Sequence, residues 1–144
     1  MSATGLDNVL KRLGAYEQAI VDEARNIVQR TAVSIHGDAV KSIQRGRKSG
    51  RIYLKTQAGI PHQASAPGEA PATDTGALVS SLQLKGAGTS TMYVYTNLKY
   101  APFLEFGTSR LAPRPFMRPA LQSNRPKFER AMQDLLKTVK AKLR

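Results

Sequence analysis

The sequence predicts an α+β domain over residues 1–144, with a long helix at its start, an antiparallel sheet of three to five strands, and a helix at its end. Three observations support this fold class. Apolar residues recur at helical spacing over the first 45 residues and again near the end of the chain, and alternating residues between them are typical of strands. A chain of 144 residues is long enough to bury a core without disulfides, and this one has no cysteine.

Residues 1–45 are predicted to form one long helix or two shorter ones. Forty helical residues extend about 60 Å, which is too long to lie over one small core. Gly37 is unfavourable inside a helix, so we expect a kink or break there, leaving either two helices or one that projects to meet a neighbour. One apolar stripe contains Leu6, Val9, Leu10, Leu13, Tyr16, Ile20, Ile27, Val28, Ala32, Ile35, Ala39 and Ile43.

Residues 57–75 are predicted to form a long extended loop after a short strand at 52–54. The loop contains three prolines and two glycines and has no apolar periodicity. Connections within compact domains are usually about 4 to 6 residues long. A loop of this length is therefore either a disordered linker or a functional arm.

Residues 76–120 are predicted to form the sheet region. A helical turn at 76–81, capped by Asp74 or Thr75, leads into an antiparallel hairpin of residues 82–85 and 92–96. Residues 100–109 are expected to add a sheet edge and a turn.

The last helix is predicted over residues 124–143. Ser123 or Asn124 is expected to cap it, with Pro126 in its first turn. It is expected to pack on the open face of the sheet through Phe128, Met132, Leu135, Leu136, Val139 and Leu143.

The net charge of +12 indicates a strongly positive surface. The basic residues form two clusters without acidic residues, at 41–55 and 110–127. They are either solvated charges or the contact surface for an anionic partner, which is nucleic acid or an acidic protein surface. The side chains proposed for such contacts are Arg45, Arg47, Lys48 and Arg51.

The sequence contains no pattern that requires a catalytic or metal site, and we expect no enzyme activity and no cofactor. His36 and His62 are far apart and have no companions at ligand spacing. A magnesium-dependent nuclease would need Glu69, Asp74 and Glu105 to gather, which no spacing requires. We instead expect Glu105, which lies between two apolar residues, to pair with Arg114 or Arg118.

The chain also lacks a long apolar segment and an apolar signal region. We therefore expect a soluble protein, made in the cytoplasm, without a membrane partner.

Two segments together resemble paired signatures of a family of head-to-tail joining proteins, the tail-completion or neck proteins of long-tailed bacteriophages. The first signature is similar to residues 64–78, ASAPGEAPATDTGAL. The second is similar to residues 100–120, YAPFLEFGTSRLAPRPFMRPA. The basic run at 44–51 matches no feature of this family.

The resemblance implies a structural protein of the virion neck, made in the host bacterial cytoplasm, that joins or completes the tail at the DNA-filled head. It implies a ring, either a hexamer or a dodecamer. Its neighbours would be a portal-side adaptor or stopper and the tail terminator or tail tube, and genome DNA would pass through its channel without sequence-specific contacts. The competing hypothesis is a basic nucleic-acid-binding protein of the cytoplasm.

Two groups of residues are assigned to assembly on this basis. The first anchors the core or the subunit interface and contains Tyr100, Phe103, Glu105, Phe106, Phe116 and Arg118. The second is a loop expected to reach a neighbouring subunit and contains Pro67, Gly68, Glu69, Pro71, Asp74 and Thr75.

Overall fold

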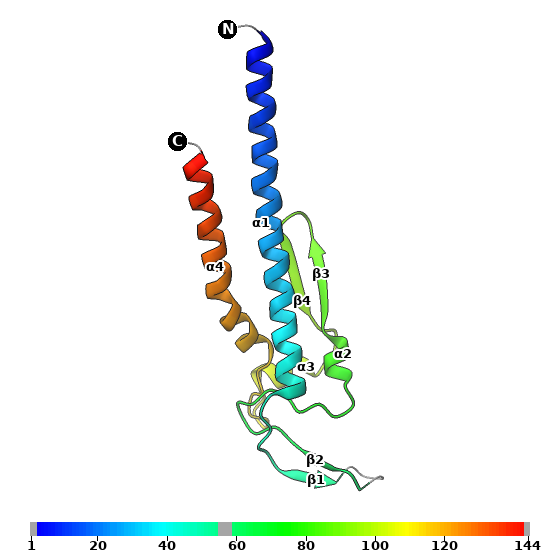
Figure 1. Cartoon of the computed structure of the whole chain (residues 1–144). Helices are drawn as coiled ribbons and strands as arrows, with labels where there is room; N and C mark the ends of the chain where they lie inside the picture. Colours follow the sequence, from blue (N-terminus) through cyan, green and yellow to red (C-terminus); the bar gives the residue numbers. More distant parts are fainter. Residues whose placement is uncertain (1–2, 55–58, 143–144) are drawn as a thin grey trace.

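The computed structural model describes residues 3–54 and 59–142, and its α+β class is the one predicted (Figure 1). Residues 1, 2, 57, 58 and 143 of the predicted elements lie outside the described part. The helices are α1 (Ala3–Arg45), α2 (Ala77–Ser81), α3 (Ala101–Phe106) and α4 (Met117–Lys142). The strands are β1 (Ile52–Leu54), β2 (Pro61–Gln63), β3 (Gln83–Ala87) and β4 (Thr91–Tyr95).

Helix α1 is a single helix of 43 residues, and the break expected at Gly37 does not occur. A glycine inside a helix costs only about 1 kcal/mol relative to alanine. Ala39 and Ile43, on the next turns, are fully buried, and this burial offsets the cost. Of the two alternatives for residues 1–45, the structure therefore has the single helix that projects beyond the core.

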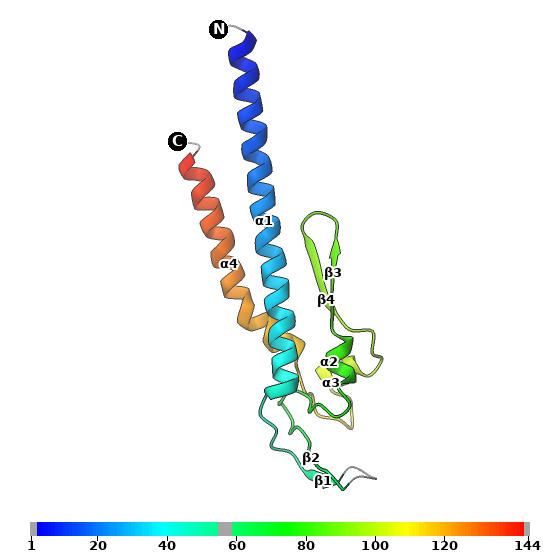
Figure 2. The ribbon, with the colours of Figure 1, turned by 45° about the vertical axis from the view of Figure 1, so that its right-hand side comes forward.

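Helices α1 and α4 lie side by side and run in opposite directions in both views (Figures 1 and 2). The end of α4 lies beside Tyr16, whose hydroxyl donates a hydrogen bond to the Val139 carbonyl at 3.4 Å. The Lys142 ammonium lies 5.5 Å from the centre of the same ring. The first turns of α1 extend beyond the end of α4 in both views.

The sheet is smaller than predicted. In place of one sheet of three to five strands, the described residues form two separate two-stranded antiparallel sheets. The predicted hairpin is confirmed as β3 and β4, with Leu84 opposite Val94. The second pairs β1 with β2, so part of the predicted extended loop folds back as a strand, with Tyr53 opposite His62. Helices occupy the positions where further strands were expected.

The prediction of a sheet edge at residues 100–109 is wrong, because α3 forms there. Pro102 lies in the first turn, where its missing N–H has no cost. Ala101 and Glu105 are both buried, which is the four-residue spacing of one helix face. Gly107 ends the helix with φ 76° and ψ −179°, a conformation essentially restricted to glycine.

The last helix begins at Met117 and not near residue 124, so its predicted start is also wrong. Pro126 lies inside the helix, and Asn124 is buried instead of capping it. The Asn124 side-chain amide donates to the Asp38 carboxylate at 2.7 Å and to the Ala120 carbonyl at 2.9 Å. Helix α4 packs mainly on α1, whereas it was expected to cover a sheet.

The core lies at the end of the molecule where the last turns of α1 meet α2, α3 and the start of α4. The buried residues of this core are Ala39, Ile43, Leu78, Leu82, Ala101, Phe116 and Ala120.

Among the helices of the described part, none has the length and apolar character of a membrane span.

Candidate functional site

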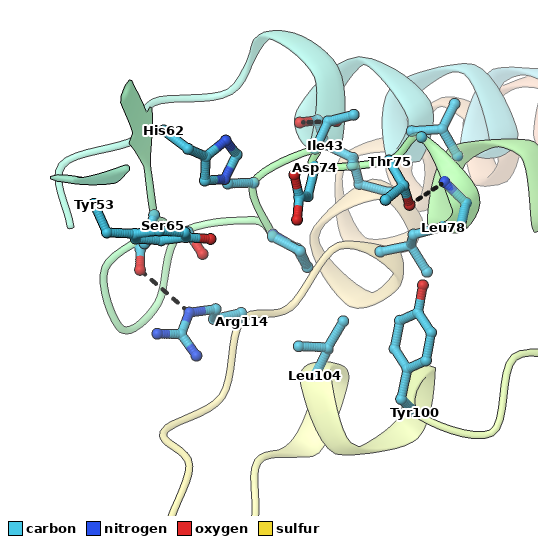
Figure 3. A pocket seen from close by; sticks show the side chains of 17 residues that line it. Ile43, Tyr53, His62, Ser65, Asp74, Thr75, Leu78, Tyr100, Leu104 and Arg114 are labelled. Atoms are coloured by element: carbon cyan, nitrogen blue, oxygen red, sulfur yellow. Dashed lines mark hydrogen bonds between the residues drawn. The ribbon is translucent and has the colours of Figure 1, made fainter. Parts of the chain in front are cut away.

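The two signature segments, 64–78 and 100–120, come together at the C-terminal end of α1. We call this region the signature joint. A cavity of about 370 Å³ opens between the segments (Figure 3). Leu78 and Tyr100 lie on one side of it, and His62 and Arg114 on the other. Two hydrogen bonds connect the segments. The Arg114 Nε donates to the Ser65 carbonyl at 3.3 Å, and the Gly68 N–H donates to the Pro113 carbonyl at 2.9 Å.

Glu105 is the central polar residue of the second segment and is 7% exposed. Its carboxylate accepts hydrogen bonds from three consecutive backbone N–H groups: those of Phe116 at 2.8 Å, Met117 at 3.0 Å and Arg118 at 2.8 Å. These donors open α4, where N–H groups lack helical partners and the helix dipole favours negative charge. Glu105 therefore caps α4 from another helix.

The predicted pairing of Glu105 with an arginine side chain is wrong. No ion pair joins Glu105 to Arg114 or Arg118, all three of which are described. The Arg118 guanidinium instead lies 5.3 Å from the centre of the Phe106 ring. A carboxylate surrounded by three backbone donors has its charge compensated without a cation, which is why the arginines remain available elsewhere.

Glu69, in the first segment, also has a carboxylate that accepts three hydrogen bonds. Its carboxylate accepts hydrogen bonds from the Ser49 hydroxyl at 2.6 Å, the Ser49 N–H at 2.9 Å and the Ala66 N–H at 2.8 Å. Arg47 forms a longer ion pair with it at 3.8 Å. The hydrogen bonds from Ser49 and Ala66, with the charge of Arg47, lower the pKa of Glu69 to about 2.

The basic run at 44–51 is thereby explained in part, because it holds the first signature segment. The Lys48 ammonium donates to the Ala70 carbonyl at 2.8 Å and to the Ser42 carbonyl at 3.2 Å. Partial burial lowers the pKa of Lys48, and the negative charge of Glu69 opposes this shift. Arg45, Arg47 and Arg51 remain exposed.

The residues of the predicted interface loop lie in different surroundings. Pro67 and Gly68 are exposed at its tip, and Asp74 and Thr75 are exposed before α2. Pro71 is buried. Together with Glu69, which is hydrogen-bonded within the chain, Pro71 fixes the loop to the end of α1.

The aromatic residues of the second segment divide into two sets. Phe116 is 1% exposed and belongs to the core. Phe103 and Phe106 are 55% and 67% exposed, and Tyr100 is also exposed. Large aromatic side chains with this exposure are typical of contact surfaces.

Sequence reasoning missed two residues of this region, Ser49 and Asn124. Ser49 lies in the basic run at 44–51, which was interpreted only through the charges of its lysine and arginines. Asn124 was interpreted as a helix cap because asparagine is common there. The proline at residue 119, which can occupy a first helical turn, was a signal for the earlier start of α4.

The polar side chains at the joint form hydrogen bonds within the chain. Within residues 3–54 and 59–142, no group of three or more His, Cys, Asp or Glu side chains could hold a metal ion. Glu69 and Glu105, two of the carboxylates that a nuclease would need, are both occupied by hydrogen bonds to N–H and O–H groups.

Comparison with protein families finds a match over most of the chain. Residues 7–107 match the model of the HK97-gp10-like family, described as "Bacteriophage HK97-gp10, putative tail-component". The matched residues contain the first signature segment and α3, and they end before the start of α4. Comparisons with curated proteins and with solved structures found no match.

Proposed function

We propose that this chain, which belongs to the HK97-gp10-like family of bacteriophage tail components, forms a ring in the neck of the virion. The ring joins or completes the tail at the DNA-filled head. The observation that carries the proposal is the family match, which covers most of the chain and makes it a tail component. The proposal adds the place of the protein in the neck and its closure into a hexamer, with a dodecamer as the alternative.

The distribution of apolar residues supports a role in assembly. Tyr100, Phe103 and Phe106 are exposed, which favours a subunit interface, because isolated domains seldom expose several large aromatic groups close together in sequence. The tip of the interface loop, at Pro67 and Gly68, is available to a neighbouring subunit. Closed rings satisfy such surfaces completely.

The net charge of +12 supports a position close to DNA or to acidic neck proteins. Arg45, Arg47 and Arg51 are exposed at the end of the molecule that carries the signature joint. Contacts with phosphate groups would be independent of base sequence. Neighbours on either side, the portal-side adaptor or stopper and the tail terminator or tube, would provide acidic surfaces. The proposed chemistry is binding without catalysis.

The experiment that tests this proposal uses the phage that encodes the chain. We expect mass spectrometry to detect the chain in purified particles. A phage lacking the chain should accumulate separate heads and tails, and the chain supplied from a plasmid should restore joining. Absence of the chain from purified particles would overturn the proposal.

A basic nucleic-acid-binding protein of the cytoplasm makes a different prediction. Its affinity for free DNA or RNA would be submicromolar and would fall steeply between two salt concentrations in a filter-binding titration. A ring component that acts mainly through protein contacts should bind free DNA weakly at both.

A further inference from the structure

The first turns of α1 carry an apolar face that is mostly uncovered in the described part of the chain, although Val9 and Leu13 line a shallow hollow with Lys142 at the end of α4. Leu6, Val9, Leu10 and Leu13 are 57–60% exposed. Helix α4 ends beside Tyr16, and the first turns of α1 extend beyond its end in both views (Figures 1 and 2). We call these four residues the N-terminal face. Four exposed large apolar residues on one face are costly in water, which indicates that another surface covers them.

A groove of matching character lies elsewhere on the molecule, between β4 and α4 with α1 as its floor. Two hollows of about 350 and 480 Å³ form it, and they share Ile35, Met92, Val94 and Leu121. Phe128 lies at one end, and Phe106 and Arg118 lie at the other. We call it the hairpin groove. Leu121 and Phe106, on its walls, are more than half exposed, so the groove can accept a further apolar element.

We propose that the N-terminal face of one subunit docks into the hairpin groove of the next copy of the chain. This inference rests on the ring proposed above and names the contact that builds it. The dimensions agree. Residues 117–128 of α4 extend about 17 Å along the groove, and residues 6–13 of α1 extend about 10 Å at 1.5 Å per residue.

Charge distinguishes a second copy from other occupants. Residues 6–17 contain two acidic residues, Asp7 and Glu17, and two basic residues, Lys11 and Arg12. The next two acidic residues, Asp22 and Glu23, already form ion pairs with arginines of the same helix. Glu17 follows Leu13 by four residues and Leu10 by seven, so it lies on the N-terminal face. Arg118 and Arg125 line the groove, although Arg125 also pairs with Glu129 at 2.8 Å. An apolar face that carries one carboxylate thus meets an apolar groove that carries two arginines.

The contact must join different subunits. The floor of the groove contains Val28 and Ile35 of α1 itself, and residues 6–13 belong to the same unbroken helix. Fifteen residues separate Leu13 from Val28, which is about 22 Å along the axis. The face cannot fold back onto its own groove. Because the two surfaces differ, each copy uses one of them on either side. This is a head-to-tail pattern, which gives a ring when the rotation between successive copies closes.

Crosslinking in assembled particles tests the contact, because the chain has no cysteine of its own. A chain with Leu10→Cys and Leu121→Cys is supplied to the phage that lacks the protein, and purified particles are treated with a short bismaleimide. We expect a ladder of multimers. The matched control is Val33→Cys with Leu121→Cys, since Val33 lies on α1 and is 57% exposed, like Leu10. This control should give no ladder.

The outcomes separate this inference from the proposed function. If the Leu10→Cys, Leu121→Cys chain is present in particles but crosslinks no better than the control, the contact is wrong and the neck role stands. If the unsubstituted chain is absent from purified particles, the neck role fails, and the ring on which this inference rests fails with it.

A second measurement distinguishes a head-to-tail contact from a symmetric one. Purified Leu10→Cys and Leu121→Cys chains, one carrying a tag, are crosslinked alone and as a mixture. We expect mixed dimers only in the mixture. Dimers of Leu10→Cys alone would show that two N-terminal faces pair with each other, which would overturn the proposal. Crosslinks to a different neck protein in place of a second copy would also overturn it.

Discussion

The two ends of α1 have opposite relations to solvent. At its C-terminal end, Ala39 and Ile43 are buried, and the adjoining polar groups at Lys48 and Ser49 have partners within the chain. At its N-terminal end, Leu6 and Leu10 are more than half exposed. One helix with a continuous apolar stripe thus uses its last turns to fold the subunit. Its first turns remain for a contact outside the subunit.

The comparison indicates that stability and assembly are located in separate parts of the molecule. Substitutions in the signature joint should therefore unfold the chain, and substitutions on the N-terminal face should leave it folded but unable to assemble. Four experiments examine this separation, in order of expected effect on stability.

Glu105→Ala should have the largest effect. It removes the acceptor for three N–H groups at the start of α4, and we expect the free energy of unfolding to fall by about 3 kcal/mol. Urea unfolding measures this change. Glu129→Ala, which removes an exposed carboxylate from α4, is the control and should change stability by less than about 0.5 kcal/mol. A loss below about 1 kcal/mol for Glu105→Ala would show that the cap is not essential.

Gly107→Ala should have the next largest effect, a loss of about 2 kcal/mol. The backbone conformation is unfavourable for alanine, and the added Cβ would lie 2.7 Å from the Leu111 carbonyl oxygen. Gly88→Ala is the reference, because Gly88 has a positive φ of 63° but its Cβ would meet nothing within 4 Å. Thermal unfolding of both variants should show the smaller loss for Gly88→Ala. Equal losses would exclude a contribution from the close contact.

The hydrogen bonds of Glu69 should make stability depend on pH. The pKa of this group is about 2 in the folded chain and near 4.5 ordinarily, so its stabilising effect is complete above pH 4.5 and is lost as the pH falls toward 2. The melting temperature of the wild-type chain should therefore approach that of Glu69→Gln as the pH falls from 4.5 toward 2. Parallel curves for the two chains would contradict the proposed role of Glu69.

Leu6→Gln with Leu10→Gln should have the smallest effect on stability, within about 0.5 kcal/mol, because both side chains are already exposed. The same variant should fail to restore the joining of heads and tails. Circular dichroism and plasmid complementation measure the two properties. Val33→Gln, at a position of similar exposure, should retain both. Unfolding of the double variant would show that the N-terminal face also stabilises the subunit.

Local patterns in the sequence predicted the parts of the fold that depend on neighbouring residues. The length of α1, the hairpin of β3 and β4, the strand at 52–54 and the helical turn at 76–81 follow from side-chain periodicity and turn residues. Residues 100–109, in contrast, were predicted as a sheet edge and a turn, whereas residues 101–106 form a helix. Its apolar residues satisfy a short helix as well as a strand, and only burial of Ala101 and Glu105 together distinguishes the two.

The candidate site was predicted as a set of segments but not as a set of contacts. Residues 64–78 and 100–120 were recognised together, and they do meet at the signature joint. The partners of their two carboxylates were not predicted, because Ser49 lies 20 residues from Glu69 and the N–H groups bound by Glu105 lie 11 to 13 residues away. Every residue except proline also has a backbone N–H group, so the sequence does not indicate which of these groups binds a carboxylate.

The sequence by itself determined that the first and last parts of the chain are helical, the helical turn at 76–81, the β3–β4 hairpin, the positive charge and the family signatures. Each of these depends on residues close together in the chain or on composition. Tertiary structure alone decided that α4 begins at Met117, that Glu105 caps it, and that the apolar stripe of α1 is buried at one end and exposed at the other. These features depend on which segments meet in space. A stripe of apolar residues looks the same whether its partner is the same chain or the next one.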